Sequence, residues 1–353
     1  MPSGITNQLK ELAGTDIPAG FSRFVVQLSK LYNSLASASI KEDPASSLFD
    51  PAVRQHFFYL QALSRIYKKI HDREMFESLR KEFKIVEDQL GKIDFYDGWV
   101  KEFSQRQNFP SLLLDYYHSR KNFELDSLRK MLDEKKWIAD DFFMVRKILS
   151  ELSAAEWMST ENDRNAIAAF LDDELDDFEE DYHENKFDFN DVEEGIHEIR
   201  RQLRWFSIYA QALDGLIQIE NVEIEDSNMK KYFTAEVLNS PYNILPSPKQ
   251  GSIPLYIHAP EFYALSWMVN ELGKLKDDGL RFHALKDAVE ATDITSKKEA
   301  DGYVSSFAGS DTFSPQEIPQ IVAQLCDEFM NQHLVIKKIR EDVKASAAQN
   351  NPA

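Results

Sequence analysis

PAVRQHFFYLQALSRIYKKI, residues 51 to 70, repeats apolar side chains at three- and four-residue spacing. That spacing is the 3.6-residue period of an amphipathic helix, and Pro51 stands where the first turn of a helix tolerates proline. The chain has only 12 Gly and 13 Pro in 353 residues. The same period runs through FSRFVVQLSKLYNSL (21–35), MFESLRKEFKIVEDQLGKI (75–93), DDFFMVRKILSEL (140–152) and IPQIVAQLCDEFMNQHLVIKKI (318–339). We therefore predict an all-α fold.

The bulk composition narrows the class of protein. Hydrophobic residues make up 43% of the chain and the net charge is −19. No basic segment followed by an apolar run opens the sequence, and no stretch approaches the roughly 18 apolar residues of a membrane span. Cys326 is the only cysteine, which excludes an internal disulfide and a cysteine-based zinc site. We expect a cytoplasmic protein that attracts neither nucleic acid nor anionic membrane.

Two segments interrupt the helical pattern. NSPYNILPSPKQGSIPLYIHAP, residues 239–260, carries five of the 13 prolines, so it cannot be helical throughout. It is too apolar for a disordered linker, and we expect an ordered insertion packed on the helices. DDELDDFEEDYHE, residues 172–184, holds nine carboxylates, yet Leu175, Phe178 and Tyr182 keep helical spacing through it. A helix with a strongly solvated outer face fits best, and a cation site or a surface that docks a protein partner are the alternatives.

The segment VEEGIHEIRRQLRWF, residues 192–206, concentrates basic residues in this acidic chain. Asp191 and Glu194 fit a capping box, so we expect a helix from Val192. At about 100° per residue, four basic side chains share an arc of about 100°, opposite an apolar face. The four are His197, Arg200, Arg201 and Arg204, and the apolar face holds Ile196, Ile199, Leu203 and Phe206.

This basic stripe has two interpretations. In one, Glu193 and Glu194 pair with His197, and the 172–184 helix neutralises the arginines, each exposed pair contributing about 0.3–0.5 kcal/mol. In the other, the stripe faces a cleft and binds phosphate oxygens, for which the planar donor fork of arginine is well suited. The negative net charge is only a weak objection to phosphate binding. At physiological salt, charges are screened over about 8 Å, so an anion at the stripe feels the nearby arginines more than the distant acidic helix.

HEIRRQLRWF resembles the signature helix of the CHAD domains, the conserved histidine α-helical domains, in which basic residues follow a histidine at three and seven residues. His197, Arg200 and Arg204 match those places, whereas Trp205 and Phe206 stand where the family continues with basic residues. A helix ending in Leu-Gly followed by Asp is also typical of the family. The chain has this twice, in DQLGKIDFYDG (88–98) and NELGKLKDDG (270–279).

The resemblance implies two pseudosymmetric halves built of long antiparallel helices. Asp50 and His56 repeat the spacing of Asp191 and His197, although apolar residues follow His56. We expect N-terminal helices over 1–44, a first half over 45–185, a second half over 186–345 with the insertion at 239–260, and a disordered tail over 346–353.

The resemblance further implies binding of inorganic polyphosphate, or another phosphorylated anion, in the groove between the halves. His197, Arg200, Arg201 and Arg204 would hold it, and Lys230 and Lys231 are candidate contributors because they precede the insertion. The competing hypothesis is an interaction scaffold that kept the helical fold and lost the anion groove.

The sequence indicates no enzyme, cofactor or metal. No phosphate-cradling glycine loop, nucleophile elbow or catalytic triad is recognisable. Two Glu-x-x-His pairs, ending at His183 and His197, lie too close in sequence for a di-iron bundle. His258 reads as a loop residue, and Glu261 as a residue that favours a helix start. His333, Lys337 and Arg340 share a face of the last helix. We favour an ordinary solvated face, and the alternative is that this helix packs back across the bundle and adds charge to the groove.

Overall fold

The computed structural model describes residues 4–13, 17–49, 51–223, 227–296, 300–308, 313 and 316–349. Helices make up most of these residues, and only two short strands occur among them, so the predicted all-α class is confirmed. No helix in the described part of the chain combines the length and apolarity that crossing a membrane requires. The chain divides into two compact units, residues 1–163 and 164–353.

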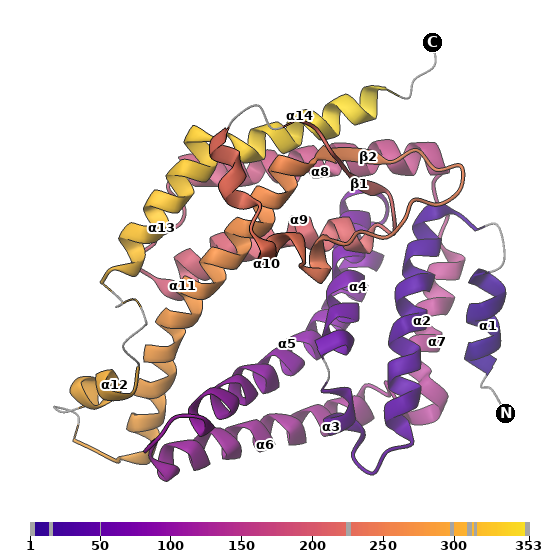
Figure 1. Cartoon of the computed structure of the whole chain (residues 1–353). Helices are drawn as coiled ribbons and strands as arrows, with labels where there is room; N and C mark the ends of the chain where they lie inside the picture. The colour runs from indigo at the N-terminus through magenta and orange to yellow at the C-terminus, as the bar shows by residue number, and fades with distance from the viewer. Residues whose placement is uncertain are drawn as a thin grey trace. The chain divides into compact units, whose positions relative to one another are not determined.

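The first unit is a set of helices joined by short connections. They are α1 (Gly4–Ala13), α2 (Ala19–Ser39), α3 (Pro44–Leu48), α4 (Pro51–Ile70), α5 (Arg73–Ser104), α6 (Ser111–Glu134), α7 (Ala139–Ala154) and the start of α8 (Thr160–His183). α4 packs on α2 and α5, and α5 packs on α6 (Figure 1). The 3.6-residue spacing of apolar residues gives each helix the apolar face that this packing needs. Phe24, Tyr67, Phe76 and Trp157 form one aromatic cluster of its core.

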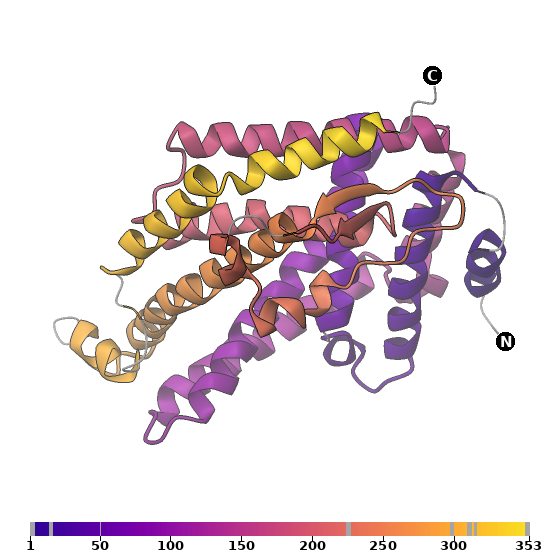
Figure 2. The same ribbon diagram turned by 45° about the horizontal axis from the view of Figure 1, so that its top comes forward.

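The elements of the second unit are arranged around one long helix, α11. Its elements are the rest of α8, the π-helical turn η1 (Val192–His197), α9 (Glu198–Ala212), β1 (Ile217–Glu220), η2 (Ser227–Tyr232), α10 (Ala235–Leu238), η3 (Pro241–Asn243), β2 (Leu255–His258), α11 (Ala259–Thr292), α12 (Ala300–Ala308), α13 (Ile318–Asp327), η4 (Glu328–Gln332) and α14 (Val335–Ala348). α9, η2, α13 and α14 all pack on α11. α14 also runs beside α8 (Figure 2).

The proline-rich insertion contributes a strand. β2 pairs in parallel with β1, in the register Ile217 to Leu255 and Glu220 to His258. The other edge of β2 is satisfied by α14, because the Ser346 hydroxyl accepts from the Tyr256 backbone N–H at 3.0 Å. Arg164 donates to the carbonyl of Ile253 at 2.9 Å. The insertion is thus ordered and packed, as its apolar content predicts.

Two boundaries differ from those expected. The units separate within α8, upstream of the predicted junction at 185/186, and the pseudosymmetry of the halves stays a prediction. The tail expected to be disordered from residue 346 is helical as far as Ala348, because Ser346 is buried against β2. Residues 350–353 lie outside the described part.

Candidate functional site

The basic helix begins where its capping residues predict. The Asp191 carboxylate accepts the backbone N–H of Glu194 at 2.9 Å. The backbone carbonyl of Asp191 accepts from Gly195 and Ile196 at 3.1 and 3.2 Å, and the first turn is wound as a π-helix that leads directly into α9. The expected start at Val192 is therefore confirmed.

The two faces of this helix divide as the periodicity predicts. Ile196, Ile199, Leu203 and Phe206 are buried. Of the basic residues, His197, Arg200 and Arg204 are half-buried and Arg201 is exposed. The helix therefore packs through its apolar face and holds three basic side chains at the margin of the packed region.

Arg200 is the residue of this stripe with the most unusual surroundings. Its guanidinium lies against Gly273 in the middle of α11, and its Nε donates to the backbone carbonyl of Val269 at 3.1 Å. Among the described residues it forms no ion pair with a carboxylate. Burial lowers the pKa of Arg200 from its ordinary value, and the charge of Asp277 opposes that change only in part. Arg200 thus carries a partly desolvated positive charge, and no described residue supplies a direct counter-ion.

The two Leu-Gly pairs do not end helices, contrary to the expectation from the sequence. Gly91 lies inside α5 and Gly273 inside α11, and both helices continue for several turns. Each glycine instead makes room for an arginine. A β-carbon on Gly91 would lie 2.6 Å from Nη2 of Arg54, and one on Gly273 would lie 3.0 Å from Nε of Arg200. We call this arrangement the arginine-over-glycine contact.

The two arginine-over-glycine contacts differ in their charge balance. In the first unit, Arg54 pairs with Glu87 at 2.8 Å and with Asp94 at 3.0 Å. Glu87 stands four residues before Gly91, and the residue four before Gly273 is Val269, which offers only its backbone carbonyl. The carboxylate that neutralises the arginine in the first unit is therefore missing in the second.

The other basic residues of the stripe already contact groups of the protein. Arg201 pairs with Glu198, one turn earlier, at 2.5 Å, and its side chain is 55% exposed. His197 and Arg204 also interact with other groups of the chain. Among the described residues, this partly exposed ion pair is the one that holds Arg201, and a stronger anion could replace it at small cost.

Lys230 and Lys231 lie on η2, at a different face of α11 from Arg200. Lys231 pairs with Glu328 and lies over the rings of Tyr232 and Trp267. Trp267 and Gly273 are six residues apart, so they lie about 120° apart around α11. Lys230 is exposed. The structure therefore does not bring these lysines to Arg200.

The carboxylates of the acidic segment have a partner that the sequence did not indicate. Arg340 of α14 lies within 3.0 Å of Asp172 and 2.9 Å of Glu179, and it also pairs with Asp176. Its side chain is only 16% exposed. The interpretation of Arg340 as part of an ordinary solvated face is therefore wrong, because it joins α14 to α8.

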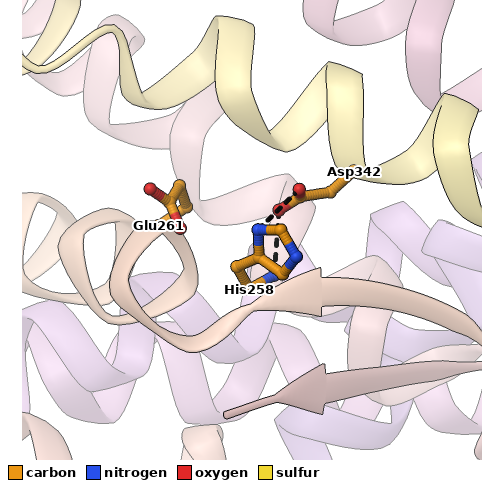
Figure 3. Close-up of side chains that lie close together, drawn as sticks. All are labelled: His258, Glu261 and Asp342. Carbon is orange, nitrogen blue, oxygen red and sulfur yellow. Dashed lines mark hydrogen bonds and ion pairs between the residues drawn. The ribbon is translucent and has the colours of Figure 1, made fainter. Parts of the chain in front are cut away.

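A second cluster of polar side chains lies where β2, α11 and α14 meet. It consists of His258, Glu261 and Asp342, drawn in Figure 3. The Nδ1 atom of His258 is 2.9 Å from one carboxylate oxygen of Asp342, and the backbone N–H of His258 donates to the other at 2.9 Å. One imidazole nitrogen and two carboxylates are a ligand set that a metal ion could use.

Comparison with known proteins gives no relative: no family model matches the chain, and no curated protein or solved structure is similar to it. The resemblance to the CHAD domains therefore stays a prediction based on short motifs.

The sequence identified Arg200, but not the glycine beneath it or the role of Asp342. A signal for the glycines existed, since the apolar period continues past Gly91 through Ile93.

Proposed function

We propose that this protein is a non-enzymatic, cytoplasmic binder of inorganic polyphosphate or another phosphorylated anion, with Arg200 at the centre of its site. The observation that carries the proposal is the half-buried guanidinium of Arg200, which has no carboxylate paired to it among the described residues. A phosphate oxygen would supply the missing counter-charge through charge-assisted hydrogen bonds of about 1.5–3 kcal/mol each. His197, Arg201 and Arg204 lie on the same helix and would complete the site.

The contrast with the first unit supports this assignment. There Glu87 and Asp94 neutralise Arg54, and an anion would have to displace two carboxylates to bind. Arg200 offers its charge without such competition. The net charge of −19 slows the approach of a polyanion, but at physiological salt it acts over only about 8 Å. We expect one site per chain, of moderate affinity and in the second unit.

The test is a titration with long-chain polyphosphate at two salt concentrations. Wild type is compared with Arg200→Ala and with the matched control Arg54→Ala, which removes the neutralised arginine of the other contact. We expect binding that weakens as salt rises and is about tenfold or more weaker in Arg200→Ala, in line with the loss of one charge-assisted contact. Arg54→Ala should bind as wild type does. Absence of binding at low salt, or equal loss in both variants, would overturn the proposal.

A protein-interaction scaffold is the second candidate. The observation that favours it is a group of exposed apolar side chains in and beside the insertion, namely Leu238, Tyr242, Ile244, Ile253 and Tyr256. The acidic helix α8 could add charge to such a surface, because among the described residues Asp173 and Glu180 make no ion pair with α14. If the protein binds no phosphorylated anion at low salt, the interaction scaffold is the candidate function that remains.

A further inference from the structure

The His258, Glu261 and Asp342 cluster is held together by the backbone. His258 is the last residue of β2, and Glu261 lies in the first turn of α11, which follows directly. Asp342 of α14 reaches the same point because it accepts the backbone N–H of His258. Three elements therefore fix the positions of the three side chains, independently of the basic stripe on α9.

Two carboxylates of this cluster are buried with too little positive charge around them. Glu261 is 7% exposed and Asp342 is 8% exposed. Glu261 receives no hydrogen bond from another described residue, and its nearest cation is Nζ of Lys338 at 3.8 Å, on a side chain that is itself 40% exposed. Burial raises the pKa of both carboxyl groups. The Glu261 carboxylate accepts a hydrogen bond from its own backbone N–H. A buried carboxylate with so few partners is still costly, and a bound cation would offset that cost.

The second ring nitrogen of His258 also has a partner. The β1–β2 register places Glu220 beside His258, and its carboxylate is 3.7 Å from Nε2. Histidines that bind metal through one nitrogen commonly direct the other toward a carboxylate, which fixes the tautomer and makes the ligand more basic. Nδ1 faces Asp342 (Figure 3). Nε2 faces Glu220, so the ring is oriented as a metal ligand would be.

We propose that His258 Nδ1, Glu261 and Asp342 bind one divalent transition-metal ion, with Zn²⁺ and Mn²⁺ as the best-fitting candidates. Their ligand atoms lie within 4.8 Å of one another, and metal–ligand distances for such atoms are about 2.0–2.2 Å. On metal binding, Nδ1 would lose the proton that it now donates to Asp342, and that proton would pass to solvent. The Asp342 oxygen that accepts it would turn to the metal, while the other oxygen keeps the backbone N–H of His258. Three protein ligands leave a further position for water or another ligand.

The first test measures Zn²⁺ binding by competition with a chromophoric chelator. Wild type is compared with Glu261→Gln and with the control Glu290→Gln, an exposed glutamate of the same helix. Glu261→Gln keeps the shape of the side chain and removes a buried charge, so far-UV circular dichroism should show it folded. We expect one site per chain in wild type and in the control, and at least tenfold weaker binding in Glu261→Gln. Equal affinity in all three proteins would mean binding by surface carboxylates alone and would overturn the proposal.

A second variant tests the role of the ring orientation. Glu220 is 54% exposed, so Glu220→Gln carries little risk to folding. A carboxylate that orients a metal-binding histidine contributes about 10–100-fold in metal affinity. We expect Glu220→Gln to weaken Zn²⁺ binding by about tenfold and to leave the melting temperature of the metal-free protein unchanged. Unchanged Zn²⁺ affinity would show that His258 does not bind metal as proposed.

Discussion

At the scale of single residues, Gly91 and Gly273 of the two long helices serve close approach and not chain reversal. A glycine inside a helix costs about 1 kcal/mol relative to alanine, so its presence needs a reason. At Gly91 and Gly273 the reason is a guanidinium that fills the place of the missing β-carbon. The Leu-Gly pairs could be found in the sequence, but their partners could not. Arg54 precedes Gly91 by 37 positions and sits on another helix.

Gly98 provides a direct comparison for Gly91 on the same helix. A β-carbon on Gly98 would meet nothing within 4 Å, so Gly98→Ala should stabilise the protein by about 0.5–1 kcal/mol through helix propensity alone. Gly91→Ala has the same propensity gain but displaces Arg54 from Glu87, which costs about 1.5–3 kcal/mol. We expect a net loss of about 1 kcal/mol in urea unfolding. A gain equal to that of Gly98→Ala would show that the contact contributes nothing.

At the scale of elements, a group of ion pairs joins α8 to α14. Burial alone would raise the pKa of Asp172, but hydrogen bonds from Arg340 and Lys344 outweigh it and hold the pKa below its ordinary value.

The sequence predicted both helices, and it placed Leu175 and Phe178 in the core correctly. It could not predict the pairing, because Arg340 follows Asp172 by 168 positions. The strands β1 and β2 were missed since four residues are too few for a reliable alternating pattern.

Replacement of Arg340 tests the junction of α8 and α14. Arg340→Ala leaves three carboxylates without their shared, largely buried partner, and we expect a loss of about 2–3 kcal/mol in urea unfolding. Because the folded pKa of Asp172 is lowered, its stabilising contribution is present above the unfolded value near 3.8 and is lost as pH falls below it. Stability measured from pH 6 to pH 3 should therefore fall more steeply in wild type than in the variant.

Lys344 is the control for that experiment. It pairs with Asp172 at 3.0 Å, but its side chain is 56% exposed, and exposed pairs contribute about 0–1 kcal/mol. Lys344→Ala should therefore cost less than 0.5 kcal/mol and keep most of the pH dependence. Equal losses in Arg340→Ala and Lys344→Ala would mean that general charge balance, and not the buried junction, holds the two helices.

At the scale of the whole molecule, each unit has its own apolar core, and the boundary falls within the first turn of α8. The period of apolar residues was sufficient to predict the fold class, since it reflects burial along each helix. It could not locate this boundary, because α8 is continuous across it. The last residue of the first unit, Asp163, is 1% exposed and is bound by Arg23 at 2.5 Å and by the Tyr67 hydroxyl at 2.6 Å.

This buried triad should set the stability of the first unit. Asp163→Ala would leave the positive charge of Arg23, which is 5% exposed, without its carboxylate, and breaking a buried pair in this way costs about 3–5 kcal/mol. Trp205 and Trp267 are the tryptophans of the second unit. Their replacement by phenylalanine leaves fluorescence that reports the first unit alone, through Trp99, Trp137 and Trp157. The ring of Trp157 lies 5.2 Å from that of Tyr67. In that background we expect Asp163→Ala to lower the urea midpoint strongly.

Glu161 stands in the same turn of α8 and is exposed, so Glu161→Ala is the matched control and should change stability by less than 0.5 kcal/mol. The second unit provides an independent comparison. In a second background, the two tryptophans of the second unit are kept and those of the first unit are replaced, so that fluorescence reports the second unit. There the urea midpoint should be unchanged by Asp163→Ala and lowered by Arg340→Ala. If both variants lowered both midpoints equally, the chain would unfold as one cooperative body, and the division at Asp163 would have no energetic meaning.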